Sequence, residues 1–244
     1  MPRSSCVLRA AAALAAAAAA RAGWVDNFTD FDPSIWAQAT DIEHCSDGAC
    51  FQARVDHLHY GPGGLVSALT QEPCNTTSSA CCAGSKCASW ASGKLATVTS
   101  QAYGTYEARL QPAHRAGSQT PPSNAFSCWT PSYLTSPHNE IAVCFSGSDA
   151  SSVHFSYWYD STAHTTLLYP GFDFSAEMHD YKVVWAPTYL SFYIDGVLAH
   201  EVKGTSANLP SKAGYTAIIL RPKTTAYIAD SFFAVESMSY SEEY

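Results

Sequence analysis

The stretch PHNEIAVCFSG, residues 137–147, places one carboxylate within a pattern typical of a β-strand. Side chains of a strand alternate between its two faces, so Glu140, Ala142 and Cys144 share one face and the apolar residues between them face a core. Two carboxyl groups about 5 Å apart, a nucleophile and an acid/base, carry out retaining hydrolysis of a glycosidic bond. The stretch keeps the first carboxyl group, but a thiol stands four residues later where the second could be.

Cys144 is a poor replacement for an acid, because a thiol has an ordinary pKa of about 8.5 and hydrogen-bonds weakly. Loss of acid/base assistance costs roughly 10²–10⁴ in rate. The surrounding sequence, NAFSCWTPSYLTSPHNEIAVCF, has the pattern of two strands joined by a turn near Ser136. Pairing residues equidistant from that turn places Cys128 opposite Cys144, within disulfide reach. We therefore predict a Cys128–Cys144 disulfide that closes position 144 chemically.

Another side chain could supply the missing proton. His154 alternates with Ser156 and Trp158, so these three residues should share the face of Glu140 if the strands pair in register. A histidine is a suitable acid near neutral pH, although a half-exposed histidine bonded to a neighbour is the more ordinary interpretation. His138 is a second candidate. Trp158 is either a stacking platform for a sugar or a core aromatic residue.

Short strand patterns continue along nearly the whole chain. The runs YKVVW (181–185) and TYLSFYI (188–194) are rich in β-branched and aromatic residues, and Asp195-Gly196 then predicts a tight hairpin. No amphipathic helix pattern follows residue 23. We predict a single all-β domain over residues 23–244, an antiparallel β-sandwich with a disulfide-rich loop at 74–87.

Residues 1–22 have the pattern of a signal peptide, with a basic start, an alanine-rich apolar stretch and a small-residue cleavage site. No other stretch is long and apolar enough for a membrane span. We therefore expect a secreted protein without membrane insertion. Asn27 and Asn75 begin the N-glycosylation motifs Asn-Phe-Thr and Asn-Thr-Thr, which fit this expectation.

Eight cysteines remain once residues 1–22 are removed, and an even number in a secreted chain predicts disulfides. Besides Cys128–Cys144, we predict Cys45–Cys50 and two bonds among the cysteines at 74, 81, 82 and 87. Zinc is the alternative for this cluster. The chain contains no Cys-x-x-Cys pair, however, and zinc sites commonly use one.

The formal net charge of the 244 residues is −8, and it becomes −11 without residues 1–22, which hold three arginines and no acid. This balance disfavours nucleic acids and anionic membranes as partners. Neutral polysaccharides stay compatible with it, and the 6 tryptophans and 14 tyrosines suit either a β-rich core or sugar stacking. We expect a monomer.

The chain resembles glycoside hydrolase family 16, which includes laminarinases, lichenases, xyloglucan-active enzymes and fungal wall transglycosylases. The resemblance is carried by Glu-Ile-x-Val-x-Phe from Glu140, by GTYEARLQP (104–112) and, most specifically, by MHDYKVVWAPTYLSFYIDGVL (178–198). It covers nearly the whole chain after the signal peptide. The resemblance implies a concanavalin A-like β-jelly roll whose concave sheet carries a sugar-binding cleft.

The resemblance also implies roles for single positions. The family's catalytic Glu-x-Asp-x-Glu falls on Glu140, Ala142 and Cys144, so the nucleophile is kept while the middle acid and the acid/base are replaced. Its sugar-binding Glu and Arg fall on Glu107 and Arg109. That pair could equally be an exposed ion pair of little consequence, and Glu140 could bind sugar hydroxyls or pair with Arg109 without attacking any bond.

Further positions depart from the family's pattern. The aromatic residue that commonly stands two before the nucleophile is His138, and an Asn-x-aromatic pattern becomes Ser156-Tyr157-Trp158. A typical Asn-Leu-Trp becomes Ile219-Leu220-Arg221. Asp230 matches a calcium-binding aspartate of the family, which implies a structural calcium at most. No cofactor is required for the chemistry.

Two functions follow from these observations. The first is an active endo-β-glucanase or transglycosylase that uses Glu140 as nucleophile with a non-standard acid/base. The second is a protein that binds β-glucan or a related wall polysaccharide through the former cleft. We expect retaining hydrolysis to be lost or strongly reduced, because two of the three acidic positions are replaced. A purely structural wall protein has no positive feature in its favour.

Overall fold

The computed structural model describes residues 23–40, 51–71, 82–83, 86–87, 90–115, 125–135, 138–222 and 231–244. The predicted signal peptide, the Cys45–Cys50 pair, Asn75 and Asp230 lie outside these residues. Within the described ranges, no helix is long and apolar enough to cross a membrane.

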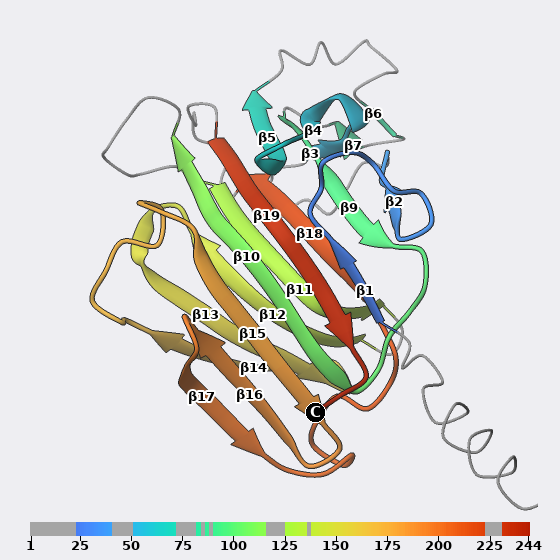
Figure 1. Cartoon of the computed structure of the whole chain (residues 1–244), viewed down its shortest axis with the longest axis vertical. Coiled ribbons are helices and arrows are strands. Elements are labelled where there is room, and N and C mark those ends of the chain that lie inside the picture. The colour runs from blue at the N-terminus through green and yellow to red at the C-terminus, as the bar shows by residue number, and fades with distance from the viewer. Residues whose placement is uncertain are drawn as a thin grey trace, which may run out of the picture.

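The described strands form two large sheets that stack face to face (Figure 1). Sheet A has ten strands, in the order β17 (Val197–Lys203), β16 (Tyr189–Ile194), β15 (His179–Ala186), β10 (Gly104–Arg115), β19 (Ser231–Ser241), β5 (Gly64–Gln71), β8 (Trp90–Ser92) and β3 (Phe51–Ala53). Two short strands complete it: β1 (Gly23–Asp26) pairs with β19, and β4 (Leu58–Gly61) pairs with β5. A 3-10 turn, η1 (Val55–His57), precedes β4.

Sheet B has seven strands, in the order β14 (Thr162–Leu168), β13 (Asp149–Tyr159), β12 (His138–Ser146), β11 (Ala125–Thr135), β18 (Tyr215–Pro222), β9 (Lys94–Thr97) and β2 (Trp36–Gln38). The pairing is antiparallel throughout sheet B, and in sheet A it is parallel between β3 and β8. The predicted all-β sandwich is therefore confirmed.

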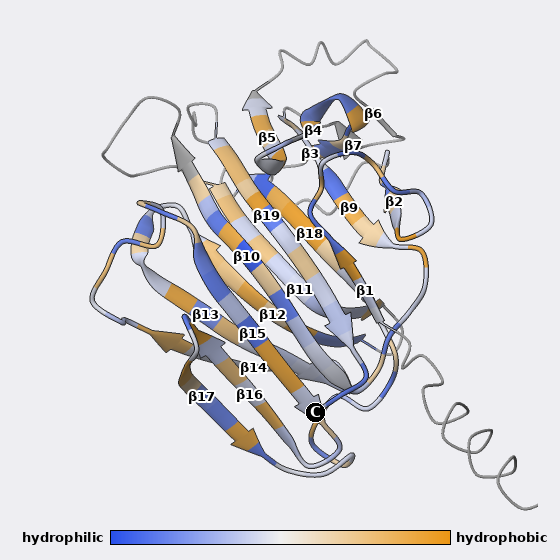
Figure 2. Cartoon of the chain, viewed as in Figure 1, coloured by the Kyte–Doolittle hydropathy of each residue, from blue (hydrophilic) through white to orange (hydrophobic). Residues whose placement is uncertain are grey.

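The core lies between the two sheets, and strand alternation decides which residues reach it. In β15, Tyr181, Val183 and Trp185 are at most 1% exposed, and in β12 Ile141 and Val143 are fully buried. Apolar and polar bands alternate along these strands in Figure 2. Burial of each large apolar side chain contributes about 1.5–3 kcal/mol, so the two inner faces hold the sheets together.

The predicted hairpin at Asp195-Gly196 joins β16 to β17. Both turn residues have positive φ angles, 49° for Asp195 and 77° for Gly196. Positive φ at both central positions is the requirement of a type I′ turn, whose twist matches that of the flanking strands, and Asp-Gly is among the sequences that adopt it most readily.

The disulfide-rich loop predicted at 74–87 includes described residues that form regular structure. Two short strands, β6 (Cys82–Ala83) and β7 (Lys86–Cys87), pair with each other as a separate ribbon. Each strand has two residues, and this is too short for the alternation of apolar and polar residues by which a strand is recognised in a sequence.

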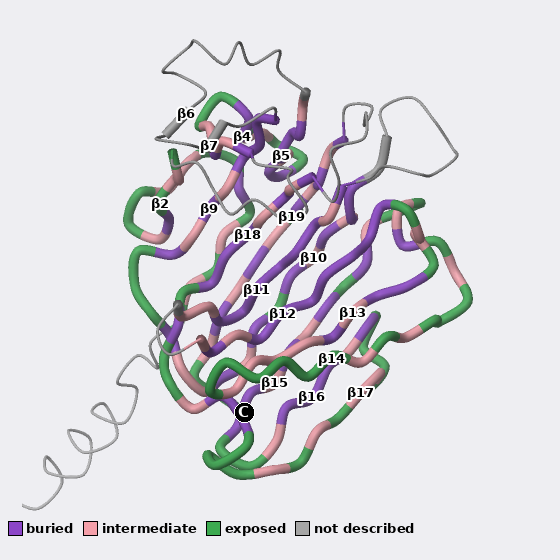
Figure 3. The backbone as a smooth tube through the Cα atoms, turned by 180° about the vertical axis from the view of Figure 1, so that it is seen from behind, coloured by how far each residue is buried: buried purple, intermediate pink, exposed green. Residues whose placement is uncertain are grey.

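β12 occupies the middle of sheet B, between β11 and β13, and β18 follows on the far side of β11. The tube of β11 and β12 is mostly buried in Figure 3, whereas β14 at the edge is mostly exposed. Side chains from four neighbouring strands can therefore converge on the outer face of β12.

Candidate functional site

The outer face of sheet B carries the side chains around Glu140, and we call it the Glu140 face. Because Ile141 and Val143 are buried in the core, Glu140, Ala142 and Cys144 point to the other side of the sheet. The face comprises Phe126 and Cys128 of β11, His138, Glu140, Ala142 and Cys144 of β12, His154, Ser156 and Trp158 of β13, and Arg221 of β18.

The pairing of β12 with β13 places the three predicted residues of β13 beside the three predicted catalytic positions of β12. Glu140 lies opposite Trp158, Ala142 opposite Ser156, and Cys144 opposite His154. Directly opposed residues of an antiparallel pair have Cβ atoms about 4.5–5.5 Å apart, so each pair is in contact range.

Glu140 is held by the side chain of His138. The Nε2 atom of His138 lies 2.8 Å from Oε2 of Glu140, and the Glu140 side chain is 19% exposed. The His138 ring also stacks on Trp158, with ring centroids 4.4 Å apart and planes inclined by 7°. Tyr133 meets the edge of the same imidazole at 5.9 Å. These contacts join Glu140 and Trp158 into one packed unit through His138.

Arg221 adds a fixed positive charge to the face. Its guanidinium carbon lies 4.9 Å from the centroid of the Phe126 ring. Burial lowers the pKa of Arg221, while the negative charge of Glu140 acts in the opposite direction. An arginine keeps its charge at any ordinary pH, so Glu140 lies in the field of a permanent cation as well as against an imidazole.

Cys128 and Cys144 are joined by a disulfide, with their Cα atoms 4.2 Å apart. Both cysteines are at least 93% buried, and with the fully buried Ala142 they form a small apolar cluster against which Phe126 packs. A disulfide sulfur carries no proton to donate. The position predicted for the acid/base is therefore occupied by a group that cannot act as an acid.

A β-bulge sets the register that makes this bond possible. Near the turn, Thr135 pairs with His138, which would place Trp129 rather than Cys128 opposite Cys144. The register shifts between Trp129 and Ser132, where two residues of β11 oppose one of β12. The centre of the hairpin thus lies half a residue beyond Ser136. The extra residue of β11 at the bulge shifts the register back, so that Cys128 pairs with Cys144.

His154, the other candidate for proton donation, faces the disulfide. It lies opposite Cys144 in the sheet, and its ring meets that of Phe126 edge-on with centroids 6.1 Å apart. The structure therefore keeps His154 on the Glu140 face but assigns the close contact with the carboxylate to His138.

Glu107 and Arg109 do not join this face. They project from β10 of sheet A, where Tyr106, Ala108 and Leu110 point into the core. Their side chains therefore lie on the outer face of sheet A, across the whole core from Glu140. The expectation that this pair shares a cleft with Glu140 is wrong. The sequence pattern shows that Glu107 and Arg109 lie on the same face of their strand, but it does not show to which of the two sheets that strand belongs.

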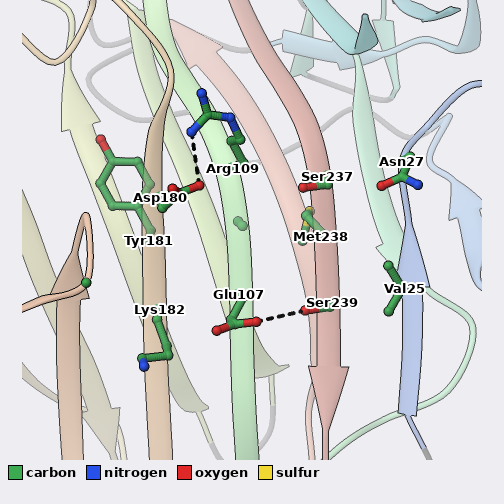
Figure 4. Close-up of a pocket in the computed structure, with 12 residues that line it drawn as sticks. Val25, Asn27, Glu107, Arg109, Asp180, Tyr181, Lys182, Ser237, Met238 and Ser239 are labelled. Carbon is green, nitrogen blue, oxygen red and sulfur yellow. Dashed lines mark hydrogen bonds and ion pairs between the residues drawn. The ribbon is translucent and has the colours of Figure 1, made fainter. Parts of the chain in front are cut away.

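Arg109 instead takes part in two ion pairs on sheet A, and Figure 4 shows the one with Asp180. Its Nε lies 2.9 Å from Oε2 of Glu236, and one terminal nitrogen lies 3.2 Å from Oδ1 of Asp180. These hydrogen bonds raise the pKa of Arg109, with that from Asp180 the larger. The predicted alternative of a Glu140–Arg109 pair is therefore also wrong.

No three metal-binding side chains come together within the described part of the chain. Asp230, the residue that matches a calcium ligand, falls outside those residues, so a structural calcium stays a prediction.

Sequence reasoning did not find the coupling of Arg221 or Tyr133 to Glu140. Tyr133 pairs with Glu140 because the hairpin centre lies half a residue beyond the predicted one. Arg221 reaches the face because β18 pairs with β11, at a sequence distance that no local pattern shows. The sequence feature that could have drawn attention to Arg221 is the arginine itself, which stands where the family typically has a tryptophan.

Comparison with known proteins places the chain among carbohydrate-active sequences. Residues 62–237 match the family described as Glycosyl hydrolases family 16. A β-glucanase of Paenibacillus polymyxa is 28% identical over 187 residues, which cover 75% of this chain and 69% of that protein. A β-glucanase of Paenibacillus macerans is 35% identical over 113 residues, which cover 46% of this chain and 45% of that protein.

The fold agrees with a solved structure as well. The β-glucanase of Bacillus licheniformis superposes with a TM-score of 0.73 over 90% of this chain and 97% of that one, at 19% identity. At this identity the likeness speaks for the fold alone, and it confirms the predicted jelly-roll sandwich.

Proposed function

The chain belongs to the glycosyl hydrolases of family 16, and from this premise we propose that it recognises a β-glucan-type polysaccharide through the Glu140 face, with retaining hydrolysis lost or strongly reduced. The observation that carries the proposal is the Cys128–Cys144 disulfide at the acid/base position. The similarity to β-glucanases supports the choice of polysaccharide.

The chemistry of the replaced positions supports the loss of hydrolysis. A retaining mechanism needs a group that protonates the leaving sugar and then activates water. The disulfide can do neither, and loss of acid/base assistance costs roughly 10²–10⁴ in rate. Ala142 also removes the like charge that would raise the pKa of a neighbouring carboxyl group.

The remaining side chains suit recognition. Glu140 offers acceptor oxygens to sugar hydroxyls, and its contact with His138 holds the carboxylate in one orientation. Trp158 offers an aromatic surface, of which one face is covered by His138. We infer that a sugar ring packs against the uncovered part of this aromatic pair while its hydroxyls bind Glu140.

The test is an assay of the purified, oxidised protein on laminarin, lichenan and xyloglucan. Binding is measured by calorimetry, and shortened or transferred chains are sought among the products. We expect binding without turnover, and a loss of affinity of about tenfold or more in Trp158→Ala, which corresponds to about 1.4 kcal/mol. Absence of binding to all three glucans would contradict the proposed ligand.

The alternative is an active endo-β-glucanase or transglycosylase with a histidine as acid. The close approach of His138 to Glu140 and the presence of His154 on the same face favour it. Turnover that Glu140→Gln abolishes would establish this alternative. Comparison of the pH–rate profiles of His138→Gln and His154→Gln would then show which imidazole supplies the proton.

The proposal includes secretion, which the pattern of residues 1–22 supports. Expression in a eukaryotic host should deliver the protein to the medium with Gly23 as its first residue, which N-terminal sequencing checks. Retention inside the cell with an intact N-terminus would contradict secretion.

A further inference from the structure

A hollow lies on the outer face of sheet A, and we call it the Arg109 groove. It has a volume of about 560 Å³ and crosses β15, β10, β19 and β1 (Figure 4). The side chains that line its walls are Val25, Asn27, Glu107, Arg109, Asp180, Lys182, Ser237 and Ser239. Buried residues of the same strands, such as Met238 and Ala108, form its floor.

Strand pairing arranges these polar groups in two rows. In the first row Lys182, Glu107 and Ser239 stand side by side on three neighbouring strands. In the second row the corresponding residues are Asp180, Arg109 and Ser237.

The rows retain capacity to bind a ligand rich in hydroxyl groups. Glu107 accepts a long hydrogen bond of 3.5 Å from the Ser239 hydroxyl, which leaves further acceptor sites on the carboxylate. The ammonium group of Lys182 lies over the ring of Tyr193 at 4.5 Å, a contact that leaves its protons available.

Asn27 stands at the β1 end of this groove as an exposed residue in the motif Asn-Phe-Thr. The motif's middle residue, Phe28, is fully buried, and Thr29 is exposed. Val25 lies two residues before Asn27, projects to the same side and is 69% exposed. The Asn27 side chain therefore lies beside the polar residues of the groove and the exposed apolar side chain of Val25.

We propose that Asn27 carries an N-linked glycan and that this glycan lies along the Arg109 groove, where it covers Lys182. In the attachment step, the Asn27 amide nitrogen forms a bond to the anomeric carbon of a lipid-pyrophosphate-linked oligosaccharide. The lipid pyrophosphate leaves, and the amide loses one proton. The step takes place in the secretory pathway, so the inference rests on secretion but not on glucan binding.

The dimensions of the sheet allow this arrangement. From β1 the groove crosses β19 and β10 to reach β15, which is three strand spacings. At about 4.8 Å per spacing the path is roughly 14 Å long. An oligosaccharide of several sugar rings spans such a path. Its first ring would cover Val25, and its hydroxyl groups would reach Ser237, Ser239 and Glu107.

The test compares the reactivity of two lysines in the secreted protein. Glycopeptide mass spectrometry first measures how much Asn27 is modified. An amine-reactive acylating reagent then labels Lys182 and, as an internal reference, Lys203, whose side chain is 80% exposed on β17. We expect Lys182 to react several-fold more slowly in the glycosylated wild type than in Thr29→Ala, while Lys203 reacts equally in both.

Matched controls separate the glycan from the substitution. Thr29→Ser keeps the motif and should behave as the wild type. Enzymatic removal of the glycan from the folded wild-type protein should restore the reactivity of Lys182 without any substitution, which covers the case that Thr29→Ala misfolds. Unmodified Asn27 in the secreted protein, or equal reactivity of Lys182 with and without the glycan, would overturn the proposal.

Discussion

Glu140 keeps its carboxylate between two basic side chains, the His138 imidazole at 2.8 Å and the positive charge of Arg221. A carboxylate in this position can serve as a nucleophile or as an acceptor of hydrogen bonds from sugar hydroxyls. The two roles differ in whether a proton donor is present at the predicted acid/base position, four residues along β12, and there the structure has the Cys128–Cys144 disulfide.

Restoring the acids should restore activity. We expect the combined variant Ala142→Asp/Cys144→Glu/Cys128→Ala to hydrolyse lichenan or laminarin roughly 10²–10⁴-fold faster than the wild type, because it regains the acid/base group. New reducing ends measure the rate.

The Cys128→Ala/Cys144→Ala variant controls for the loss of the bond, and addition of Glu140→Gln should abolish the gain. A folded restored variant as inactive as this control would show that the defect lies elsewhere on the Glu140 face.

The hairpin of β11 and β12 is the element on which the disulfide depends. Its strands are joined by a turn of which only the flanking residues are described, and its register changes at the bulge between Trp129 and Ser132. The bond then links positions 16 residues apart. A crosslink over that distance limits the freedom of the unfolded chain, which stabilises the folded hairpin.

Removal of the bond should lower stability. We expect Cys128→Ser/Cys144→Ser to reduce the free energy of unfolding by up to about 3 kcal/mol, from the entropy of a loop of this length. Urea unfolding measures the change. Wild-type protein unfolded with a reductant present should lose a similar amount, and a double variant as stable as the oxidised wild type would contradict the prediction.

The β16–β17 hairpin supplies a prediction about pH. Burial raises the pKa of Asp195, but hydrogen bonds from the Asp180 backbone and from His179 outweigh this, so its pKa lies below the ordinary value. A lowered carboxyl pKa stabilises the fold above the unfolded pKa of about 3.9, and this stability is lost as the pH falls through the lowered folded value.

Asp195→Asn isolates this charge, since Asn-Gly also favours the type I′ turn. We expect it to lower the free energy of unfolding near neutral pH by at most about 1 kcal/mol, because the Asp195 side chain is 46% exposed. Denaturant unfolding at several pH values should show the difference shrinking in acid. A difference that grows on acidification would contradict the assigned direction.

Local patterns predicted the elements better than their assembly. Asp195-Gly196 specified its hairpin, because turn chemistry acts over adjacent residues. The symmetric hairpin predicted Cys128–Cys144, although the turn lies half a residue from its predicted centre and an unforeseen bulge compensates. Alternation put Glu107 and Arg109 on one face but could not tell which face of the molecule that is.

At the scale of the whole molecule, the sandwich separates two polar surfaces. The Glu140 face and the Arg109 groove lie on the outer sides of sheets B and A, and core residues such as Trp129 and Trp185, both fully buried, fill the space between them. Energetic coupling between distant sites is carried by elements that have two discrete conformations. A core of side chains packed in one conformation therefore couples the two surfaces weakly.

The two surfaces should therefore respond independently to substitution. We expect Arg109→Ala to leave glucan affinity within about twofold of the wild type, because substitutions at distant sites are independent within about 0.5 kcal/mol. Calorimetric titration with the glucan that binds best checks this. Trp158→Ala is the control variant that is expected to lose affinity. Equal losses in both variants would place the polysaccharide on sheet A or across both surfaces.

The disulfide at position 144 also constrains how this chain can change by single substitutions. Replacing Cys144 alone by an acid leaves the Cys128 thiol unpaired and buries a new carboxyl group beside Phe126. Replacing Cys128 alone frees a thiol at the predicted acid/base position. Either single replacement thus breaks the crosslink, and only replacement of both cysteines supplies an acid at position 144 without leaving an unpaired buried thiol opposite it.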